Sequence, residues 1–346
     1  MATSEAAEGD RYSRQSRFWA IGRAGQERLR AGRVLVVGCG ALGSAGANLL
    51  ARAGVGQITI VDRDFVELSN LQRQLLFEEV DAAAGTPKAI AAARAVARIN
   101  SDVDVRPVVA DLTPTNVEQF VAEADVVLDG TDNFETRYLV NDACVKLGIP
   151  WVYGGAIGST GMSMTIVPGE TPCLRCLFPN PQPAGTMETC ETAGVLAASV
   201  VMVAAVQCTE AMKLLVGDRE HTSRGLTALD VWTNDYLHAQ GKLRDPDCPC
   251  CGQRRFEYLD ALVTSRTASL CGRDAIQVSP GQPLKLDLEE IGRRLGPTGP
   301  VASSDYLVRF FVEGHEMTVF ADGRAIIKGT TDLSVARSLY ARYVGT

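Results

Sequence analysis

Residues 33–44 read RVLVVGCGALGS, a β-branched run that passes directly into a glycine-rich turn. The run 33–37 predicts a strand, and residues 44–53 predict the helix that follows the turn. Gly38, Gly40 and Gly43 have the spacing at which glycines let a backbone approach phosphate, and the helix N-terminus favours negative charge there. A strand, turn and helix of this kind open the nucleotide-binding half of a doubly wound α/β fold.

The chain around this unit alternates strands with helices. The strands are predicted at 57–61, 103–109 and 125–129, and the helices at 87–99, 114–121 and 134–147. Because strands separated by helices imply βαβ units, we expect a mostly parallel, doubly wound, Rossmann-like sheet. Upstream, apolar and basic residues alternate over 13–30, which predicts a helix with Phe18, Ile21 and Leu29 on one side.

From Trp151 the pattern changes to paired strands. Residues 151–156 and 162–167 predict an antiparallel pair, and 226–232 with 236–243 predict a terminal hairpin. Between them, residues 193–216 are apolar nearly all round and predict a buried helix. The parallel sheet is therefore expected to be extended by antiparallel strands.

The composition shifts again after Arg255. The last part predicts a strand near 270, helices at 287–295 and 332–343, a Gly/Pro linker at 296–300, and strands at 306–312, 316–320 and 324–328. Phe310, Phe311 and Val312, with Lys328 nearby, could form a core or a docking face, and alternation in short strands favours the core. The sequence thus predicts a disordered terminus at 1–10, one domain over 11–255 and a small α+β domain over 256–346.

The bulk composition is that of an ordinary globular protein. With 346 residues, 46% hydrophobic and 22% charged, the chain can bury one large core and a smaller appendage. A net charge of −7 argues against nucleic acid or an anionic membrane as partner. The longest apolar stretch, about 193–206, is too short to span a membrane, and residues 1–10 lack a signal-peptide core. We expect a cytoplasmic protein.

Four of the ten cysteines form two C-x-x-C pairs, Cys173/Cys176 and Cys248/Cys251. In a cytoplasmic chain this spacing is typical of a structural zinc site with four thiolates and no open position for water. Cys250 is set aside, because it comes only one residue before Cys251. The scattered Cys39, Cys144 and Cys208 are expected to be buried core thiols with no role in the chemistry.

The polar residues beyond the glycine turn decide between two kinds of nucleotide chemistry. Asp62 at the end of the second strand first suggests an NAD-dependent dehydrogenase. The loops at the same edge of the sheet, however, collect two cations, an amide and further carboxylates: Arg73, Lys88, Asn70, Asp64 and Asp132. Hydride transfer does not need this mixture. Two cations that hold a triphosphate and a carboxylate that holds Mg²⁺ would suit attack on the α-phosphate of ATP.

Six motifs make the resemblance to a known family specific. RYSRQ (11–15), VVGCGALGS (36–44), VDRDFVELSNLQRQ (61–74), GTPK (85–88), LDGTDN (128–133) and the paired C-x-x-C occur in order over residues 11–255. Together they resemble the MoeB/ThiF family, relatives of ubiquitin-activating enzymes. The resemblance implies ATP-dependent adenylylation of the C-terminal glycine carboxylate of a ubiquitin-like sulfur carrier that ends in Gly-Gly, for molybdopterin, thiamine or thiolation pathways.

The resemblance also implies roles for individual residues. Gly40 and the loop around it, from Gly38 to Gly43, would hold the phosphates, and Asp62, beside Asp64, would hold the ribose. The remaining contacts to the triphosphate side are assigned to Asn70, Arg73 and Lys88, with Gln74 nearby, and Asp132 would bind Mg²⁺. Arg14 would reach into the site of the other subunit of a homodimer.

Several alternatives stay open on the sequence. Cys190 matches a cysteine that some relatives use for a covalent link with the carrier, but its neighbours Glu188 and Glu191 should raise its pKa. The acceptor could instead be a ubiquitin-like modifier or a peptide. Two alternatives from other classes of protein are an NAD-dependent oxidoreductase and a non-catalytic scaffold that binds nucleotide and a partner. The C-terminal domain could recruit the partner or stabilise a dimer, and the carrier is expected to dock near 151–167 and 226–243.

Overall fold

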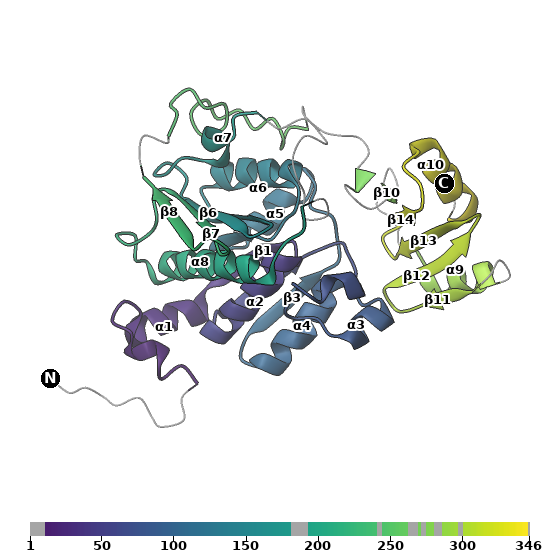
Figure 1. Ribbon diagram of the computed structural model, residues 1–346, viewed down its shortest axis with the longest axis horizontal. Helices are drawn as coiled ribbons and strands as arrows, with labels where there is room; N and C mark the ends of the chain where they lie inside the picture. Colours follow the sequence, from purple (N-terminus) through teal and green to yellow (C-terminus); the bar gives the residue numbers. More distant parts are fainter. Residues whose placement is uncertain are drawn as a thin grey trace. The chain divides into compact units, whose positions relative to one another are not determined.

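The computed structural model describes residues 11–180, 193–240, 244–261, 269–270, 275–279, 286–296 and 300–344. The chain divides into two compact units, Met1–Val263 and Thr264–Thr346 (Figure 1). Each unit has its own hydrophobic core. Residues 256–261, which follow the second cysteine pair, belong to the first unit, where Tyr258 and Leu259 are buried.

The first unit is built on an eight-stranded sheet with the order β3-β2-β1-β4-β5-β6-β7-β8. Its strands are β1 (Arg33–Val37), β2 (Gln57–Val61), β3 (Asp104–Val108), β4 (Val126–Asp129), β5 (Trp151–Ile157), β6 (Thr160–Ile166), β7 (Leu226–Asp230) and β8 (Asp235–Ala239). Strands β1 to β5 pair in parallel and β6 to β8 are antiparallel. The predicted doubly wound sheet with an antiparallel extension is confirmed.

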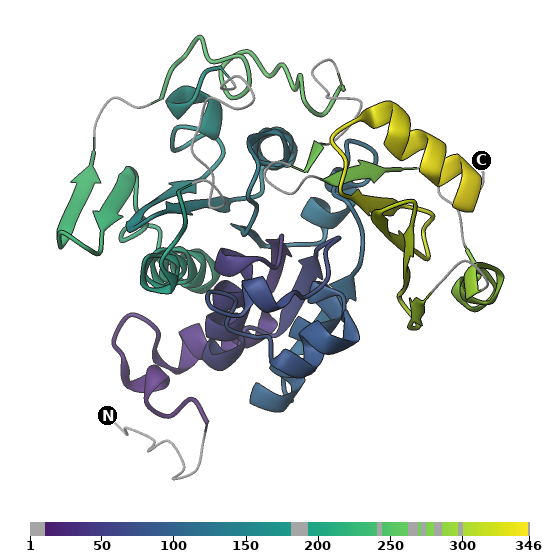
Figure 2. The same ribbon diagram turned by 45° about the vertical axis from the view of Figure 1, so that its right-hand side comes forward.

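Helices cover both faces of this sheet, because alternate residues of each buried strand point to opposite sides. Val34 and Val36 of β1 pack in one cluster, and Leu35 and Val37 pack in another. The first cluster includes α1 (Gly22–Ala31), α2 (Ala41–Ala53), α4 (Lys88–Ile99) and α8 (Ala197–Val216), and the second includes α5 (Val117–Ala122) and α6 (Phe134–Leu147). Figure 2 looks nearly along α6 and α8, which lie on opposite sides of the sheet. The shorter helical elements are η1 (Gln15–Arg17), η2 (Leu68–Asn70), α3 (Glu79–Ala84) and α7 (Leu174–Leu177).

The N-terminal helix expected over 13–30 is wrong as a single element. Helix α1 begins only at Gly22, whose φ of +58° departs from helical geometry and separates it from η1. Leu29 is fully buried as predicted, but Phe18 lies in the intervening turn and is 52% exposed. The apolar spacing was helical, but the backbone freedom of glycine allowed a turn within it.

Helix α8 is less buried than its sequence suggested. By length and hydropathy it could cross a membrane, and 56% of its most apolar window is buried inside the first unit. Its buried side carries polar groups as well, including Gln207 and Glu210, and packs against α2 and strands β5 and β6. Val201 and Met202 are exposed. A core helix with one uncovered apolar side accounts for these features.

The second unit is a six-stranded sheet of order β11-β12-β13-β14-β10-β9 with helices packed on one face. Its elements are β9 (Ser269–Leu270), β10 (Ala275–Val278), α9 (Leu288–Leu295), β11 (Val301–Ser303), β12 (Leu307–Val312), β13 (His315–Phe320), β14 (Ala325–Lys328) and α10 (Leu333–Tyr343). Phe310 and Val312 lie in the core as predicted, whereas Phe311 is 58% exposed because it points to the other face of β12. Lys328 pairs with Glu316 across the strands at 3.2 Å.

Candidate active site

The candidate site lies where the strand order reverses, between β1 and β4. At such a switch point the loops that follow the two strands diverge and leave a crevice at their carboxyl ends. Here the two loops also touch: the Gly130 amide donates to the Val37 carbonyl at 2.8 Å. Gly38 adopts a φ of +80°, which a glycine supports without strain. The glycine turn therefore packs directly against the start of the loop after β4.

Three of the glycines, Gly38, Gly43 and Gly130, are required by this packing, and a Cβ on Gly38 would lie 2.8 Å from the Gly130 carbonyl oxygen. A Cβ on Gly43 would lie 1.9 Å from the Gly38 carbonyl oxygen, and one on Gly130 would lie 2.3 Å from the same atom. Gly40 differs, because the nearest atom to its Cβ would be the Gly130 oxygen at 3.8 Å. Gly40 is also the N-cap of α2. Open space beside a helix N-terminus is what an incoming phosphate needs, so this turn fits a nucleotide.

The two kinds of glycine predict different outcomes for the same substitution. We expect Gly43→Ala to destabilise the first unit by about 3 kcal/mol, because the loop must move away from Gly38, which corresponds to a melting temperature lower by roughly 6–12 °C. Gly40→Ala should cost only about 1 kcal/mol but weaken ATP binding about tenfold. Thermal unfolding and calorimetric ATP titration of the two variants measure this. Equal losses of stability would contradict the assignment of the open side of Gly40 to the ligand.

Asp62, which follows β2, holds the glycine turn through hydrogen bonds to backbone amides. One oxygen of its carboxylate accepts a hydrogen bond from the Cys39 amide at 2.5 Å, and the other accepts from the Asp64 amide at 2.6 Å. Burial raises the pKa of Asp62 to about 6, and the charge of Lys88 opposes that rise. At neutral pH the group is mostly an anion whose remaining lone pairs can accept ribose hydroxyls. Burial also raises the pKa of the Cys39 thiol, which is consequently inert.

Lys88 is held at the site by an ion pair with Asp64. Its ammonium lies 3.2 Å from the Asp64 carboxylate, and its side chain is only 4% exposed. Its backbone amide, at the start of α4, donates to the Asp64 carbonyl at 2.8 Å. On the other side of Asp64, Arg63 pairs with Asp111 at 2.8 Å. A phosphate entering here would compete with Asp64 for a cation that is already in place.

The loop after β2 carries the next three predicted residues. Asn70 is buried and accepts the Glu67 amide at 3.2 Å, as part of a capping box around η2. The Arg73 guanidinium donates to the Ser69 carbonyl at 2.9 Å. Gln74 is buried, and among the described residues its Oε1 has no hydrogen-bond partner. The structure gives Asn70 and Arg73 local loop contacts, so their contacts to phosphate stay predictions.

The other two predicted residues, Arg14 and Cys190, are not part of this cluster. Near Arg14 in the sequence, the Tyr12 hydroxyl accepts a hydrogen bond from Asn100, and Gln15 donates to the carbonyl of Ala53, the last residue of α2. Since α2 begins at the glycine turn and runs for 13 residues, Arg14 lies about 20 Å from the turn of its own chain. Any role in catalysis would need a second copy. Cys190 lies outside the described residues.

Asp132 is exposed on the turn after β4, and beneath it lies a pair that sequence reasoning missed. Arg137 of α6 donates to Asp129 at 3.1 Å, and both side chains are buried. Burial lowers the pKa of Arg137, but the charge of Asp129, the nearby Tyr153 and Asp132, and the hydrogen bond to Asp129 together outweigh burial and leave that pKa raised. One feature of the sequence could have indicated this pair. Arg137 lies in a helix that is expected to pack on the sheet, eight residues after Asp129, the acid that ends β4.

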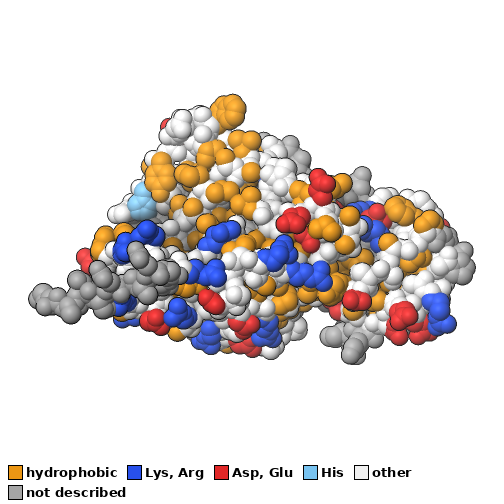
Figure 3. Space-filling view, turned by 90° about the horizontal axis from the view of Figure 1, so that it is seen from below, with side chains coloured by type: hydrophobic (Ala, Val, Ile, Leu, Met, Phe, Trp, Pro, Cys, Tyr) orange, Lys and Arg blue, Asp and Glu red, His pale blue; other side chains and the backbone are white. Residues whose placement is uncertain are grey.

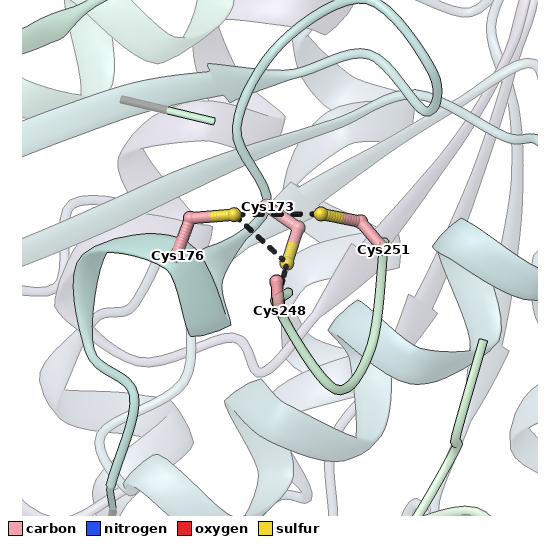
Figure 4. Close-up of side chains that lie close together, drawn as sticks. All are labelled: Cys173, Cys176, Cys248 and Cys251. Carbon is pink, nitrogen blue, oxygen red and sulfur yellow. Dashed lines mark hydrogen bonds between the residues drawn. The ribbon is translucent and has the colours of Figure 1, made fainter. Parts of the chain in front are cut away.

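The four predicted cysteines come together at the edge of the second core cluster (Figure 4). The Sγ–Sγ distances are 3.9 Å for Cys173–Cys176, 3.6 Å for Cys173–Cys248 and 3.4 Å for Cys176–Cys251. Tetrahedral zinc with Zn–S bonds of about 2.3 Å requires edges of about 3.8 Å. The donor set and its geometry fit a zinc ion with four thiolate ligands.

Cys250 is buried beside this cluster, outside the group of four, and also contacts α6. Its sulfur accepts a hydrogen bond from the Asn141 amide at 3.1 Å, and Asn141 also accepts the Leu174 amide at 2.9 Å. The same helix accepts the Tyr258 amide through Asp142 at 2.9 Å. One face of α6 thus binds both cysteine knuckles, while its first turn borders Asp132.

A doubly wound sheet with a phosphate-binding turn, a buried lysine and acid at the strand ends, and a four-thiolate cluster defines a nucleotide-binding α/β enzyme. The chain belongs to the ThiF family, whose model matches residues 12–250. It is an adenylyltransferase, and this replaces the NAD-dependent alternative. It is 44% identical to the sulfur carrier protein ThiS adenylyltransferase of Bacillus subtilis, over 97% of this chain and 99% of that protein. It is also 44% identical to the SAMP-activating enzyme E1 of Haloferax volcanii, over 74% and 93%.

Solved structures share the fold. The microcin C7 biosynthetic enzyme MccB in complex with N-formylated MccA is 25% identical, with a TM-score of 0.63 over 72% of this chain and 77% of that chain. Escherichia coli MccB with ATP is 25% identical, with a TM-score of 0.60 over 71% and 75%. The covered share corresponds in extent to the first unit.

Proposed function

We propose that this adenylyltransferase activates the C-terminal glycine carboxylate of a ubiquitin-like sulfur carrier of the ThiS kind. The observation that carries the proposal is the extent of the match to the Bacillus subtilis ThiS adenylyltransferase, which includes the second unit. The match to the SAMP-activating enzyme stops at 74% of the chain, and that to bovine MOCS3 at 70%. A shared accessory unit favours a shared kind of acceptor.

In the proposed reaction the acceptor itself is the nucleophile. A carboxylate oxygen of the terminal glycine forms a bond to the α-phosphorus of ATP, the bond from that phosphorus to the bridging oxygen breaks, and pyrophosphate leaves with the electron pair. The N-terminus of α2 at Gly40 would hold phosphate oxygens, and Asp62 would hold the ribose. Lys88 would exchange Asp64 for the triphosphate, and Arg73 would add a second cation.

Asp132 is the residue that we assign to Mg²⁺. Within the described part of the chain, the only group of three or more ligands close enough to share a metal is the cysteine cluster. Mg²⁺ in nucleotide sites is commonly held by one or two carboxylates together with substrate phosphates, and an exposed carboxylate at the strand end fits that mode. When bound, the ion would neutralise charge on the leaving pyrophosphate.

We also propose a homodimer in which a second copy supplies Arg14. The exposed side of α8 carries Val201 and Met202, and Trp19 of the N-terminal segment is 74% exposed. Figure 3 looks onto the side that carries this segment, where hydrophobic side chains gather beside Lys and Arg. Apolar patches of this kind mark interaction surfaces.

A cytoplasmic location is proposed because reduced thiols are needed for zinc.

The test is ATP–pyrophosphate exchange that depends on the acceptor. We expect exchange with ATP, Mg²⁺ and a ThiS-type carrier ending in Gly-Gly, and a loss of at least about 100-fold with the same carrier lacking its last two residues, since the nucleophile is then misplaced. Exchange with an MccA-like peptide or a ubiquitin-like modifier, but not with the carrier, would favour those acceptors instead. Absence of exchange with every acceptor would overturn the proposal.

Cys190 is not needed for this step. Adenylylation forms a bond between two substrates, so an enzyme thiol would act only afterwards. A covalent role for Cys190 stays a prediction from the family resemblance, and the flanking glutamates argue against an activated thiolate.

A further inference from the structure

The buried pair Asp129–Arg137 makes more contacts than an ion pair alone. One Asp129 oxygen accepts from the Thr131 amide at 2.9 Å and from the Thr131 hydroxyl at 2.7 Å. The other accepts from Arg137 Nε at 3.1 Å and from the Gly154 amide at 3.4 Å. A terminal nitrogen of Arg137 donates to the carbonyls of Thr131 at 2.8 Å and Gly154 at 3.0 Å.

These contacts join the turn after β4 to the neighbouring strand β5. Thr131 lies on that turn, directly before Asp132, and Gly154 lies in β5. The Arg137 guanidinium is also covered by two rings, with its carbon 5.2 Å from the centroids of Phe134 and Tyr153. The guanidinium thus has little freedom, and so has the turn.

In the described part of the chain, the other hydrogen bonds of the turn run to α6 and to β1, not to β5. Asn133 caps α6 by accepting the Thr136 amide at 2.8 Å, and Gly130 is bonded to β1. A lysine at 137 could keep the charge next to Asp129, but it lacks the planar fork that reaches both carbonyls. The arginine is therefore matched to the geometry of the turn as well as to the charge of Asp129.

We propose that Arg137, through its pair with Asp129, is a positioning residue for adenylylation. It fixes the turn Gly130–Asn133, and so sets where the Asp132 carboxylate stands relative to the glycine turn. This inference rests on the proposed role of Asp132 in the reaction. Asp132 itself is exposed, so the precision of its placement comes from the buried groups beneath it.

The experiment is a double-mutant cycle between Arg137→Lys and Asp132→Asn, read by ATP–pyrophosphate exchange. We expect Arg137→Lys to lower kcat about 30-fold and to change the KM for ATP less than about threefold, as for a misplaced group that acts in the transition state. In the Asp132→Asn background the same substitution should cost at most about threefold, because its effect passes through Asp132.

A second measurement does not depend on turnover. Hydrogen–deuterium exchange of the amides of 130–133 should accelerate at least about tenfold in ligand-free Arg137→Lys, since the turn loses its link through the guanidinium to β5. The control is Arg33→Lys, which alters an arginine bonded to Asp125 through two nitrogens at the amino ends of β1 and β4, the ends opposite to the site. It should change neither kcat nor the exchange of these amides.

The outcomes separate the inference from the proposed function. A 30-fold loss that persists in the Asp132→Asn background would overturn the positioning role, and so would unchanged amide exchange. Wild-type activity of Asp132→Asn alone would instead remove the proposed role of Asp132. If Arg137→Lys does not fold, Thr131→Val removes only the hydroxyl bonded to Asp129. We then expect a loss of about fivefold with the same coupling, and additive losses would reject the inference.

Discussion

Asp132→Asn is expected to lower ATP–pyrophosphate exchange about 10³-fold, since it removes one preorganised charge from the site where pyrophosphate leaves, and to leave the melting temperature unchanged. The side chain is exposed on the turn after β4. The bonds that shape the turn come from Asp129, Asn133 and Arg137 instead. Asparagine keeps the size of the side chain and removes its charge, so the loss should lie in catalysis and not in folding. Steady-state exchange and thermal unfolding of the purified variant measure both parts.

The matched control for Asp132→Asn is Glu135→Gln. Glu135 is an exposed carboxylate in the first turn of α6, three residues further along the chain. If loss of negative charge in this region were sufficient, both variants would fail; we expect Glu135→Gln to stay within about twofold, because an exposed charge is well screened. Calorimetry should show that Asp132→Asn still binds ATP without Mg²⁺. Exchange above about one third of the wild-type rate would contradict the assignment.

The parts of the fold that sequence reasoning predicted well depend on local patterns. A β-branched run before a glycine turn specifies a strand and its neighbouring helix, and α6 begins and ends as predicted because Asn133 caps one end and Gly148 the other. The antiparallel extension was predicted from the change of pattern at Trp151 into paired strand-like runs. In each case the residues that decide the structure are close together in the chain.

The errors depend on what packs against a segment. The spacing of Phe18 and Leu29 was helical, but the turn at Gly22 placed only Leu29 against the sheet. Helix α8 has apolar residues all round, yet one side is uncovered in a single chain. Phe311 is apolar but alternates away from the helices of the second unit. An apolar side chain favours burial, but the sequence alone does not show which surface of the protein or of a partner buries it.

The residues of the candidate site also divide into those that local motifs predict and those that depend on packing. The glycine turn, Asp62 and Lys88 were predictable because motif residues follow successive strands whose carboxyl ends meet at one edge. Arg137 was not, because an arginine on a helix is ordinarily a solvated residue. Its burial depends on Asp129, Gly154 and Tyr153, which come together only when β4 and β5 pair. The cysteine cluster, by contrast, could be predicted although 71 residues separate its two C-x-x-C pairs, because each pair is a recognisable local turn.

The cysteine cluster gives the second large effect. We expect the four thiolates to bind zinc in the protein as purified. Cys248→Ser should then lose the metal and lower the stability of the first unit by at least about 5 kcal/mol, a fraction of the free energy that a structural zinc supplies. That loss corresponds to a melting temperature lower by roughly 10–20 °C for a unit of this size. The reason is that residues 244–261 are joined to α6 through Cys250 and Tyr258, and without the metal those contacts must order that segment alone.

Cys250→Ser separates the metal from the packing around it. Cys250 is fully buried against Asn141, so its replacement should cost only about 1 kcal/mol, as for an ordinary buried substitution, and the protein should keep its zinc. Metal analysis of both variants gives the first readout. The stacked rings of Tyr138 and Tyr258, 4.7 Å apart, give a second through near-ultraviolet circular dichroism. Retention of zinc by Cys248→Ser with loss in Cys250→Ser would mean that Cys250 replaces Cys248 as the ligand. Because the two residues differ by two positions in one knuckle, this comparison tests the geometry of the cluster and not merely the need for a cysteine.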